Sequence, residues 1–372
     1  MLIGVPKEIK NNEYRVGLTP AGARELTAAG HRVLVQSGAG AGIDLSDALY
    51  RQAGAELAET AAEIYSRAEL IVKVKEPQPA ECAQLRPGQV LFAYLHLAPD
   101  LRQAQGLLAA GATAIAFETV VDRAGALPLL APMSEVAGRM AVQEAAVCLE
   151  KARGGSGVLL AGVPGVEPAR VLVLGGGVVG LNAARLAAGL GARVSVVDRS
   201  LPRLRYLDEL YGDRITTLYS TSETIEQQLS TVDAVIGAAL VPGATTPKLV
   251  TRALLGRMKP GSVLVDVAID QGGCFETSRP TTHQEPTYNI DGIVHYCVAN
   301  MPGAVARTAT FALANATLPY LLRLANLGWR EAMRADPGLL QGLNVHSGQI
   351  THQAVAAALD LPWQPAQALL DR

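Results

Sequence analysis

The segment that most constrains the fold is a run of glycines between two apolar stretches. Residues 170–174 (RVLVL) lead directly into residues 175–180 (GGGVVG), and the residues that follow (LNAARLAAGLGA) have the pattern of a helix. A second apolar stretch, residues 193–198, ends in Asp198. A strand, a glycine turn, a helix, a second strand and a terminal acid, in this order, are typical of a βαβ unit that binds a dinucleotide.

Each part of this segment has an expected purpose. Gly175 allows a tight turn, Gly177 lets the backbone approach a pyrophosphate at the helix N-terminus, and Gly180 lets helix and strand pack closely. The carboxylate of Asp198 can accept hydrogen bonds from the adenosine ribose hydroxyls. The alternative is a purely structural glycine turn, which would not explain why an acid ends the second strand at Asp198. We therefore predict a dinucleotide site that includes Gly175, Gly177, Val178, Gly180 and Asp198.

A second glycine-rich segment, residues 37–42 (SGAGAG), also follows an apolar stretch. Ile43 stands where the third glycine is needed, and no acid ends a second strand at the right distance. We interpret this segment as a glycine turn.

Short apolar stretches alternate with amphipathic ones throughout the chain, in two blocks. A length of 372 residues is enough for two domains. The predicted strands cover residues 2–6, 32–36, 70–75, 90–95 and 112–118 in the first block, and 170–174, 193–198, 215–218, 234–238 and 262–270 in the second. This pattern predicts an α/β protein with two doubly wound domains, the second a Rossmann dinucleotide-binding domain, and an active site in the cleft between them.

Two long helices are expected to connect the blocks. Residues 134–152 form one predicted helix, opened by a Ser134 cap, that carries the chain to the second block. A second helix begins at residue 308, with Pro319 as a possible kink, and the tail after it is expected to return to the first block. The predicted domains are residues 1–128 with 307–372 for the substrate, and 129–306 for the dinucleotide.

Charge and hydropathy exclude two classes of partner. The formal net charge is −2, from 32 basic and 34 acidic residues without a run of like charge, so nothing indicates nucleic-acid binding. The N-terminus lacks the pattern of a signal peptide, and no stretch of about 18 uncharged apolar residues occurs. We therefore expect a cytoplasmic protein that does not enter a membrane.

The cysteines do not have the spacing of a metal site. They form no C-x-x-C pair, and no histidine lies near them at zinc-ligand spacing. We expect no metal, and four buried thiols at Cys82, Cys148, Cys274 and Cys297.

Polar residues end several of the predicted strands. In a doubly wound sheet, ligands bind beyond the carboxyl ends of the strands, which makes Lys75, His96 and Asp270 the first candidates for a site. Taken singly, each is equally typical of a solvated, capping or hydrogen-bonded structural residue. We interpret Glu118, which follows the same rule, and Asp266, which lies inside its strand, as structural.

The N-terminal segment carries a resemblance to a known family. Residues 4–8 (GVPKE), 12–16 (NEYRV) and 18–20 (LTP) resemble a signature shared by alanine dehydrogenases and the nucleotide-binding subunit of proton-translocating transhydrogenases. Further similarity covers essentially the whole chain, in the segments KVKEP, LFAYLHLAPD, APMSEVAGRMA, GGGVVGLNAA, VPGATTPKLV, VDVAIDQGGCFETSRPTTH and YCVANMPGAV. We expect an alanine dehydrogenase, because no membrane segment follows the second domain. A transhydrogenase with a separately encoded membrane partner, and a non-catalytic NAD-binding protein, are the alternatives.

The resemblance implies a reaction and a set of residues for it. The reaction is the NAD-dependent, reversible oxidative deamination of L-alanine to pyruvate and ammonia, catalysed by a homohexamer. By position, Arg15 and Lys75 hold the carboxylate and carbonyl of the substrate, His96 is the acid/base, and Asp270 completes the site. Tyr94 and Met133 are candidate walls around the substrate methyl group.

The resemblance also implies the residues that hold NAD. They are Ser134, the turn of residues 175–180, Asp198, Arg203, and the backbone around Leu240, Asn300 and Met301. Arg199 departs from the family pattern, because an aliphatic residue is common at this position, and this leaves the rejection of NADP open.

The chemistry requires these types of residue. A guanidinium offers two parallel donors to a carboxylate, which suits Arg15. Water must add to an iminium and ammonia must leave, so one group must take up and return protons near neutral pH, as histidine does. The point charge of Lys75 can polarise the carbonyl. Asp270 could hold the water or stabilise the imidazolium.

Overall fold

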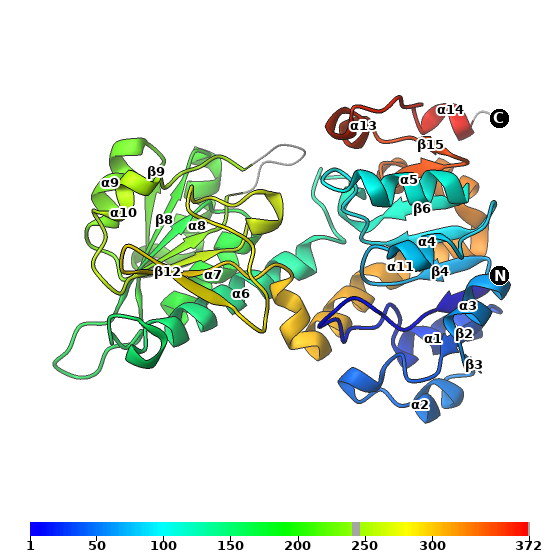
Figure 1. The fold of residues 1–372 in the computed structure, drawn as a ribbon, viewed down its shortest axis with the longest axis horizontal. Coiled ribbons are helices and arrows are strands. Elements are labelled where there is room, and N and C mark those ends of the chain that lie inside the picture. Colours follow the sequence, from blue (N-terminus) through cyan, green and yellow to red (C-terminus); the bar gives the residue numbers. More distant parts are fainter. Residues whose placement is uncertain (240–245, 371–372) are drawn as a thin grey trace. The chain divides into compact units, whose positions relative to one another are not determined.

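The computed structural model describes residues 1–239 and 246–370 (Figure 1). The chain divides into two compact units, each with its own sheet. The first unit comprises Met1–Met133 and Val305–Arg372, and the second comprises Ser134–Ala304.

The first unit is built on an eight-stranded sheet in the order β15-β14-β6-β5-β4-β1-β2-β3. Its strands are β1 (Leu2–Val5), β2 (Arg32–Gln36), β3 (Glu56–Ala58), β4 (Leu70–Val72), β5 (Val90–Ala93), β6 (Thr113–Ala116), β14 (Leu343–His346) and β15 (Gln349–Ile350). The first six are parallel, and β1 lies between β2 and β4. The C-terminal tail supplies β14 and β15, which pair antiparallel.

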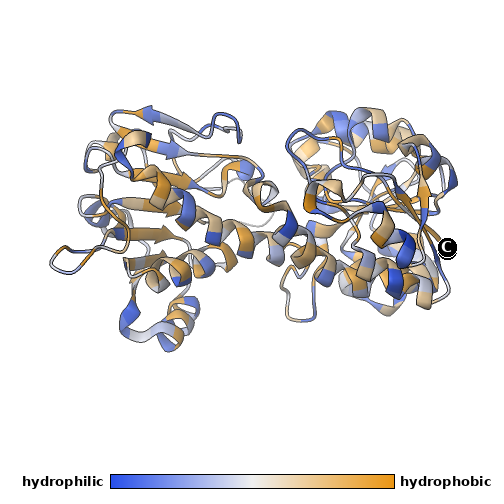
Figure 2. Cartoon of the chain, turned by 90° about the horizontal axis from the view of Figure 1, so that it is seen from below, coloured by the Kyte–Doolittle hydropathy of each residue, from blue (hydrophilic) through white to orange (hydrophobic). Residues whose placement is uncertain are grey.

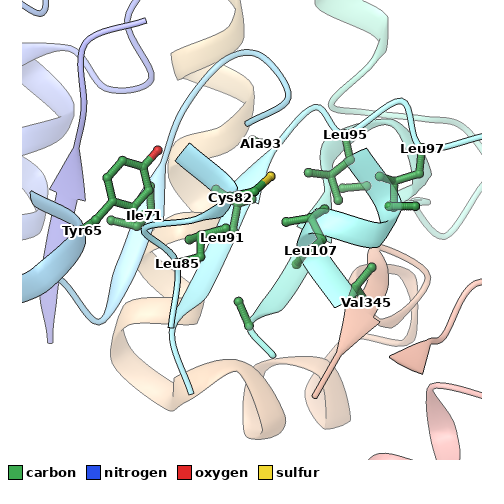
Figure 3. Close-up of a cluster of buried hydrophobic side chains, with 14 of the residues drawn as sticks. Tyr65, Ile71, Cys82, Leu85, Leu91, Ala93, Leu95, Leu97, Leu107 and Val345 are labelled. Atoms are coloured by element: carbon green, nitrogen blue, oxygen red, sulfur yellow. The ribbon is translucent and has the colours of Figure 1, made fainter. Parts of the chain in front are cut away.

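Nine helices belong to the part of the first unit that the structure describes. They are α1 (Pro20–Ala28), α2 (Asp47–Gln52), α3 (Ala61–Arg67), α4 (Pro79–Cys82), α5 (Leu101–Ala110), α11 (Ala306–Ala335), α12 (Pro337–Leu340), α13 (Gln353–Leu359) and α14 (Gln367–Leu370). One core cluster joins Leu91 on β5 and Leu107 on α5 to Val345 on β14, so the tail shares a core with the N-terminal segment (Figure 3).

The second unit has the strand order of a doubly wound nucleotide-binding fold. Its sheet runs β12-β13-β11-β10-β7-β8-β9, parallel except for the hairpin of β12 and β13. The strands are β7 (Arg170–Leu174), β8 (Arg193–Asp198), β9 (Ile215–Tyr219), β10 (Ala234–Gly237), β11 (Val263–Asp266), β12 (Thr287–Ile290) and β13 (Ile293–Tyr296). The chain order reverses between β7 and β10, which is the position where such folds bind ligands. The predicted α/β class with a Rossmann second domain is confirmed.

Five helices accompany the second sheet in its described residues. They are α6 (Ala131–Cys148), which begins in the first unit, α7 (Val178–Gly189), α8 (Leu201–Tyr211), α9 (Ser222–Leu229) and α10 (Arg252–Leu255). In Figure 2 the inner strands are coloured as hydrophobic, while the helices carry both colours. None of the described helices is both long enough and apolar enough to cross a membrane.

The strands predicted for residues 70–75, 90–95 and 112–118 are shorter in the structure. They end at Val72, Ala93 and Ala116, so Lys75, His96 and Glu118 lie beyond the strands that they were predicted to end.

Three other predicted elements are also placed differently in the structure. Helix α6 begins at Ala131, so Ser134 lies inside the helix and is not its cap. Pro132 is compatible with the earlier start, because the N–H that proline lacks would have no partner in the first turn of a helix. In α11 the backbone leaves helical geometry at Gly328, with φ +74°, and not at Pro319. The predicted strand 262–270 ends at Asp266, and the chain continues into a 3₁₀ helix, Ile269–Gln271.

The cysteine and glycine-turn predictions are confirmed. All four cysteines are free, buried thiols. In the segment of residues 37–42, Asp47 accepts hydrogen bonds from the Ser37 hydroxyl and the Gly38 N–H, and a 3₁₀ turn, Ala41–Ile43, follows.

Candidate active site

Two glycines of the turn after β7 stand where no side chain fits. Gly175 has φ +99°, and a Cβ atom there would lie 2.8 Å from backbone atoms of Ala239. A Cβ atom on Gly180 would lie only 1.8 Å from the carbonyl oxygen of Gly175. At Gly175 the backbone forms a tight turn, and at Gly180 the start of α7 packs closely against that turn. Both features were predicted from the sequence.

Gly177 faces open space. A Cβ atom at this position would meet no atom within 4 Å, and Gly177 is the N-cap residue of the twelve-residue helix α7. The next residue, Val178, is 41% exposed. The N–H groups of a first helical turn and the helix dipole together favour an anion, so this end of α7 suits a pyrophosphate.

Asp198 and Arg203 both bind the backbone of the glycine turn. One carboxylate oxygen of Asp198 accepts the Gly176 N–H at 2.6 Å, and the other accepts the Ser200 N–H at 2.7 Å. The Arg203 guanidinium donates to the carbonyl oxygens of Gly176 and Gly177. Asp198 and Arg203 therefore hold the backbone of the turn in place. The sequence pattern did not predict these hydrogen bonds to the turn.

Asp266 organises the loop that carries Asp270. The Asp266 side chain is fully buried and accepts hydrogen bonds from the N–H groups of Cys274 and Phe275 and from the Ser278 hydroxyl. Burial raises the pKa of Asp266, and these donors offset only part of that effect. Asp270 lies on this loop, in the 3₁₀ helix, and is exposed. The interpretation of Asp266 as structural agrees with these contacts.

The other residues assigned to the dinucleotide lie in the second unit. Ser134 is half-buried in α6. Asn300 has φ +63°, and its carbonyl oxygen accepts a hydrogen bond from the His283 ring at 3.2 Å. Met301, which is buried, begins a 3₁₀ helix. Leu240 lies outside the described residues.

In the first unit, Arg15 is held by Glu13. The Nε and Nη2 atoms of Arg15 donate to the two carboxylate oxygens of Glu13, at 2.6 and 2.5 Å, and both side chains are almost fully buried. Nη1 of Arg15 lies 3.2 Å from the sulfur of Met133. Burial alone would lower the pKa of Arg15, but the bonds and charge of Glu13 outweigh it, so the pKa is raised. The guanidinium is thus a permanent charge in a fixed orientation.

Lys75 is buried beside Glu76. Its Nζ atom lies 3.5 Å from Oε2 of Glu76, while Lys10 binds the other oxygen of the same carboxylate. Burial would raise the pKa of Glu76, but Lys75 and Lys10 outweigh it and lower this pKa to about 2. Glu76 is therefore ionised and keeps a compact cluster of charges at the position that follows β4.

His96 is held in an unusual backbone conformation. Its φ is +48°, which residues with a side chain rarely adopt. The Glu118 carboxylate accepts the His96 N–H at 2.6 Å and the Leu95 N–H at 3.2 Å. The His96 ring stacks on Tyr94, with centroids 5.6 Å apart and an angle of 9°. The hydroxyl of Tyr94 donates to the Leu129 carbonyl at 2.5 Å, and burial raises its pKa, so Tyr94 stays neutral.

Arg15, Lys75 and His96 gather at one edge of the first sheet. Tyr94 stacks on His96, and it lies near enough to Arg15 for the positive charge of Arg15 to lower the pKa of Tyr94 against the effect of burial. Glu76 interacts in the same way with Lys75 and His96. Lys75 and His96, which follow β4 and β5, are therefore near each other and near Arg15. The family resemblance assigned Arg15 and Lys75 to the substrate and His96 to the proton transfers.

Sequence reasoning missed the acids that hold these three residues. Glu13 and Glu76 were not singled out, and Glu118 was given no partner. The available signal was weak: each acid lies within two residues of a candidate cation or follows a predicted strand. The described residues contain no group of three or more histidine, cysteine or acidic side chains arranged to hold a metal ion.

Comparison with protein families matches nearly the whole chain. Residues 4–137 match the family described as "Alanine dehydrogenase/PNT, N-terminal domain", and residues 141–353 match "Alanine dehydrogenase/PNT, C-terminal domain".

Individual relatives match over their full length. The chain is 61% identical to an alanine dehydrogenase of Halomonas elongata and 56% identical to one of Mycolicibacterium smegmatis, covering all of both proteins. A solved L-alanine dehydrogenase is 52% identical, with a TM-score of 0.93 over 97% of this chain and 99% of that one. A solved transhydrogenase from Sinorhizobium meliloti is 28% identical, with a TM-score of 0.82 over 94% of this chain and 100% of that one. The chain therefore belongs to the alanine dehydrogenase/PNT family.

Proposed function

We propose that this protein is an NAD-dependent alanine dehydrogenase, which converts L-alanine, NAD⁺ and water reversibly to pyruvate, ammonium, NADH and a proton. The observation that carries the proposal is that Arg15, Lys75 and His96 lie in one part of the first unit, where Tyr94 links Arg15 to His96 and Glu76 links His96 to Lys75. This grouping supplies a carboxylate-binding cation, a carbonyl-polarising cation and a proton carrier, which are the groups that deamination of an α-amino acid requires.

The second unit offers residues that fit NAD. The open N-terminus of α7, beside Gly177, suits a pyrophosphate, and Asp198 is proposed to accept hydrogen bonds from the ribose hydroxyls. When bound, NAD accepts the hydride that leaves the alanine Cα atom. We propose that the predicted domain of residues 129–306 binds the dinucleotide and that the predicted domain of residues 1–128 with 307–372 binds the substrate. The proposed NAD-binding set is Ser134, Gly175, Gly177, Val178, Gly180, Asp198, Arg203, Leu240, Asn300 and Met301.

Arg15 and Lys75 are proposed to orient the substrate. Glu13 holds the Arg15 guanidinium through Nε and Nη2, and this fixed cation is proposed to bind the substrate carboxylate. Lys75 directs its charge at the carbonyl oxygen of pyruvate in the direction of alanine synthesis. Tyr94 and Met133 are buried and are the proposed limits on the substrate side chain.

His96 is proposed to move the protons. During deamination it takes a proton from the water that adds to the substrate iminium, and it gives a proton to the ammonia that leaves. The constrained backbone and the Tyr94 stack hold the ring for this task. By family resemblance, Asp270 takes part in the same proton transfers, either by holding the water or by stabilising the imidazolium.

A cytoplasmic homohexamer is also proposed, on family resemblance. Light scattering coupled to size-exclusion chromatography should then give six times the 38.9 kDa mass of one chain. A monomer or dimer at working concentrations would contradict this part of the proposal.

The test of the function is the appearance of NADH absorbance when the protein is mixed with NAD and L-alanine. A transhydrogenase subunit would instead transfer hydride between two nucleotides without requiring alanine. A non-catalytic protein would bind NADH without turnover. Either result would reject the proposed function.

A further inference from the structure

A buried lysine with two acidic neighbours lies two residues before Lys75. Lys73 follows β4, and its Nζ atom lies 2.7 Å from Oε2 of Glu8 and 3.3 Å from Oε1 of Glu81. The three side chains are 1%, 1% and 3% exposed. Tyr65 donates its hydroxyl hydrogen to Glu81 at 3.1 Å. We refer to Lys73, Glu8 and Glu81 as the Lys73 cluster.

A buried cluster of this kind adds little net stability to a fold. Desolvating buried charges costs several kcal/mol per ion, and well-packed apolar residues often stabilise a protein equally well in their place. Burial would lower the pKa of Lys73, but Glu8 and Glu81 outweigh it, so the pKa is raised and the ammonium persists. Stability alone therefore does not account for the cluster, and its hydrogen bonds to the backbone indicate what it does instead.

Those backbone bonds converge on the segment that carries Lys75. Glu8 accepts the N–H of Val74 at 2.7 Å, and the Lys73 ammonium lies 3.4 Å from the carbonyl oxygen of Lys75. Glu81 accepts the N–H of Gln78 at 2.8 Å. The cluster thus binds the backbone one residue before Lys75, at Lys75 itself and three residues after it.

We infer that the Lys73 cluster is a positioning device that sets the Lys75 ammonium for the keto-acid substrate. The inference rests on the proposed function and deepens it. Lys73 does not touch the substrate in this account and acts only through Lys75. Removing the cluster should therefore weaken the use of pyruvate, and this effect should depend on Lys75 being present.

The test is a double-mutant cycle on the full-length protein. The variant Lys73→Met/Glu8→Gln removes the ammonium together with its partner carboxyl group, so neither is left without the other, and the glutamine keeps an acceptor for the Val74 N–H. The assay is kcat/KM for pyruvate, followed by NADH oxidation with ammonium in excess. We expect a loss of about tenfold in the wild-type background and less than about twofold in a Lys75→Ala background, because residues that act through one another are not additive.

Two further measurements separate positioning from general destabilisation. NADH affinity, read from its fluorescence, should stay within about twofold of wild type. Gln89→Met is the matched control, because Gln89 is 1% exposed and its amide donates to the Tyr65 and Ala68 carbonyls at 2.8 Å, away from Lys75. This control should lower Tm and leave kcat/KM for pyruvate unchanged. If the double variant does not fold, Glu81→Gln enters the same cycle.

Two results would overturn the inference but not the proposed function. The first is an active wild type and a cluster variant with the same kcat/KM for pyruvate. The second is an equal loss of kcat/KM in the wild-type and Lys75→Ala backgrounds. A wild type that shows no ammonium-dependent reduction of pyruvate would overturn the proposed function, and the inference with it.

Discussion

Replacing Glu118 should slow the enzyme through His96, because the Glu118 carboxylate binds the backbone N–H groups of His96 and Leu95. The carboxylate accepts the N–H groups of His96, at 2.6 Å, and Leu95, at 3.2 Å, and His96 has φ +48°. A residue with a side chain in this region of backbone space carries about 1–3 kcal/mol of strain, which its surroundings must hold. Glu118→Ala leaves two N–H groups without their acceptor, at about 1–3 kcal/mol each, so the loop no longer opposes the strain.

The catalytic cost follows from the displacement of the ring. A misplacement of about 1 Å costs about 10²-fold in rate, so Glu118→Ala should lower kcat for alanine oxidation by about that factor. Glu118→Gln keeps one acceptor and loses only the charge assistance, so we expect a loss of about tenfold or less. Steady-state NADH formation measures kcat, and fluorescence measures the affinity for NADH, which should not change.

Asp47→Ala is the control for Glu118→Ala. Asp47 accepts the Gly38 N–H at 2.8 Å and the Ser37 hydroxyl, in a turn that the proposed reaction does not use. This variant should lose some thermal stability and keep its kcat. If Glu118→Ala retains kcat within twofold of wild type, the backbone of His96 is not under the control that we describe.

Five other substitutions test four separate features of the protein. His96→Ala should lower kcat by about 10²- to 10⁴-fold with near-normal NADH affinity; a variant that keeps more than about a tenth of wild-type kcat would remove His96 from the proton transfers. Asp198→Ala should lower kcat/KM for NAD and raise it for NADP, since the carboxylate repels a 2′-phosphate; equal losses with both cofactors would place the ribose elsewhere. Gly180→Ala would place a Cβ atom 1.8 Å from a carbonyl oxygen, so it should lower the free energy of unfolding by about 1–3 kcal/mol, measured by a thermal melt. Gly177→Ala should weaken NADH binding with little change in Tm. A large loss of Tm in Gly177→Ala and none in Gly180→Ala would contradict the geometry of the turn. Glu76 has a pKa of about 2, below its ordinary 4.5, so ionised Glu76 stabilises the fold fully above about pH 4.5 and this contribution is lost as the pH falls toward 2. In Glu76→Gln the Tm should therefore fall less steeply over this pH range. An unchanged dependence of Tm on pH would argue against the ion pairs.

The nucleotide-binding turn was predictable because its determinants are local. Strands β7 and β8 have the predicted bounds, residues 170–174 and 193–198, and Gly175 and Gly180 stand where a side chain would collide with backbone. Each of these features follows from residue type and spacing over about thirty positions. Local patterns of this kind carry most of the information that a single sequence offers.

The features that the sequence did not predict depend on long-range contacts. Asp270 does not end a strand, because the buried carboxylate of Asp266 binds the N–H of Cys274 and turns the chain earlier. The pairing of Lys73 with Glu8 joins residues 65 positions apart, and no local pattern indicates it. In α11, Pro319 is accommodated within the helix, and the backbone departs from helical geometry nine residues later.

The most direct test of the central claim is to follow the hydrogen that leaves the substrate. L-alanine that carries deuterium at Cα is incubated with the protein and NAD, and the NADH formed is analysed by mass spectrometry, with pyruvate and ammonium measured in the same sample. We predict that the NADH contains one deuterium and that pyruvate, ammonium and NADH form in equal amounts. NADH without deuterium, or no NADH at all, would contradict the assignment of this protein as an alanine dehydrogenase.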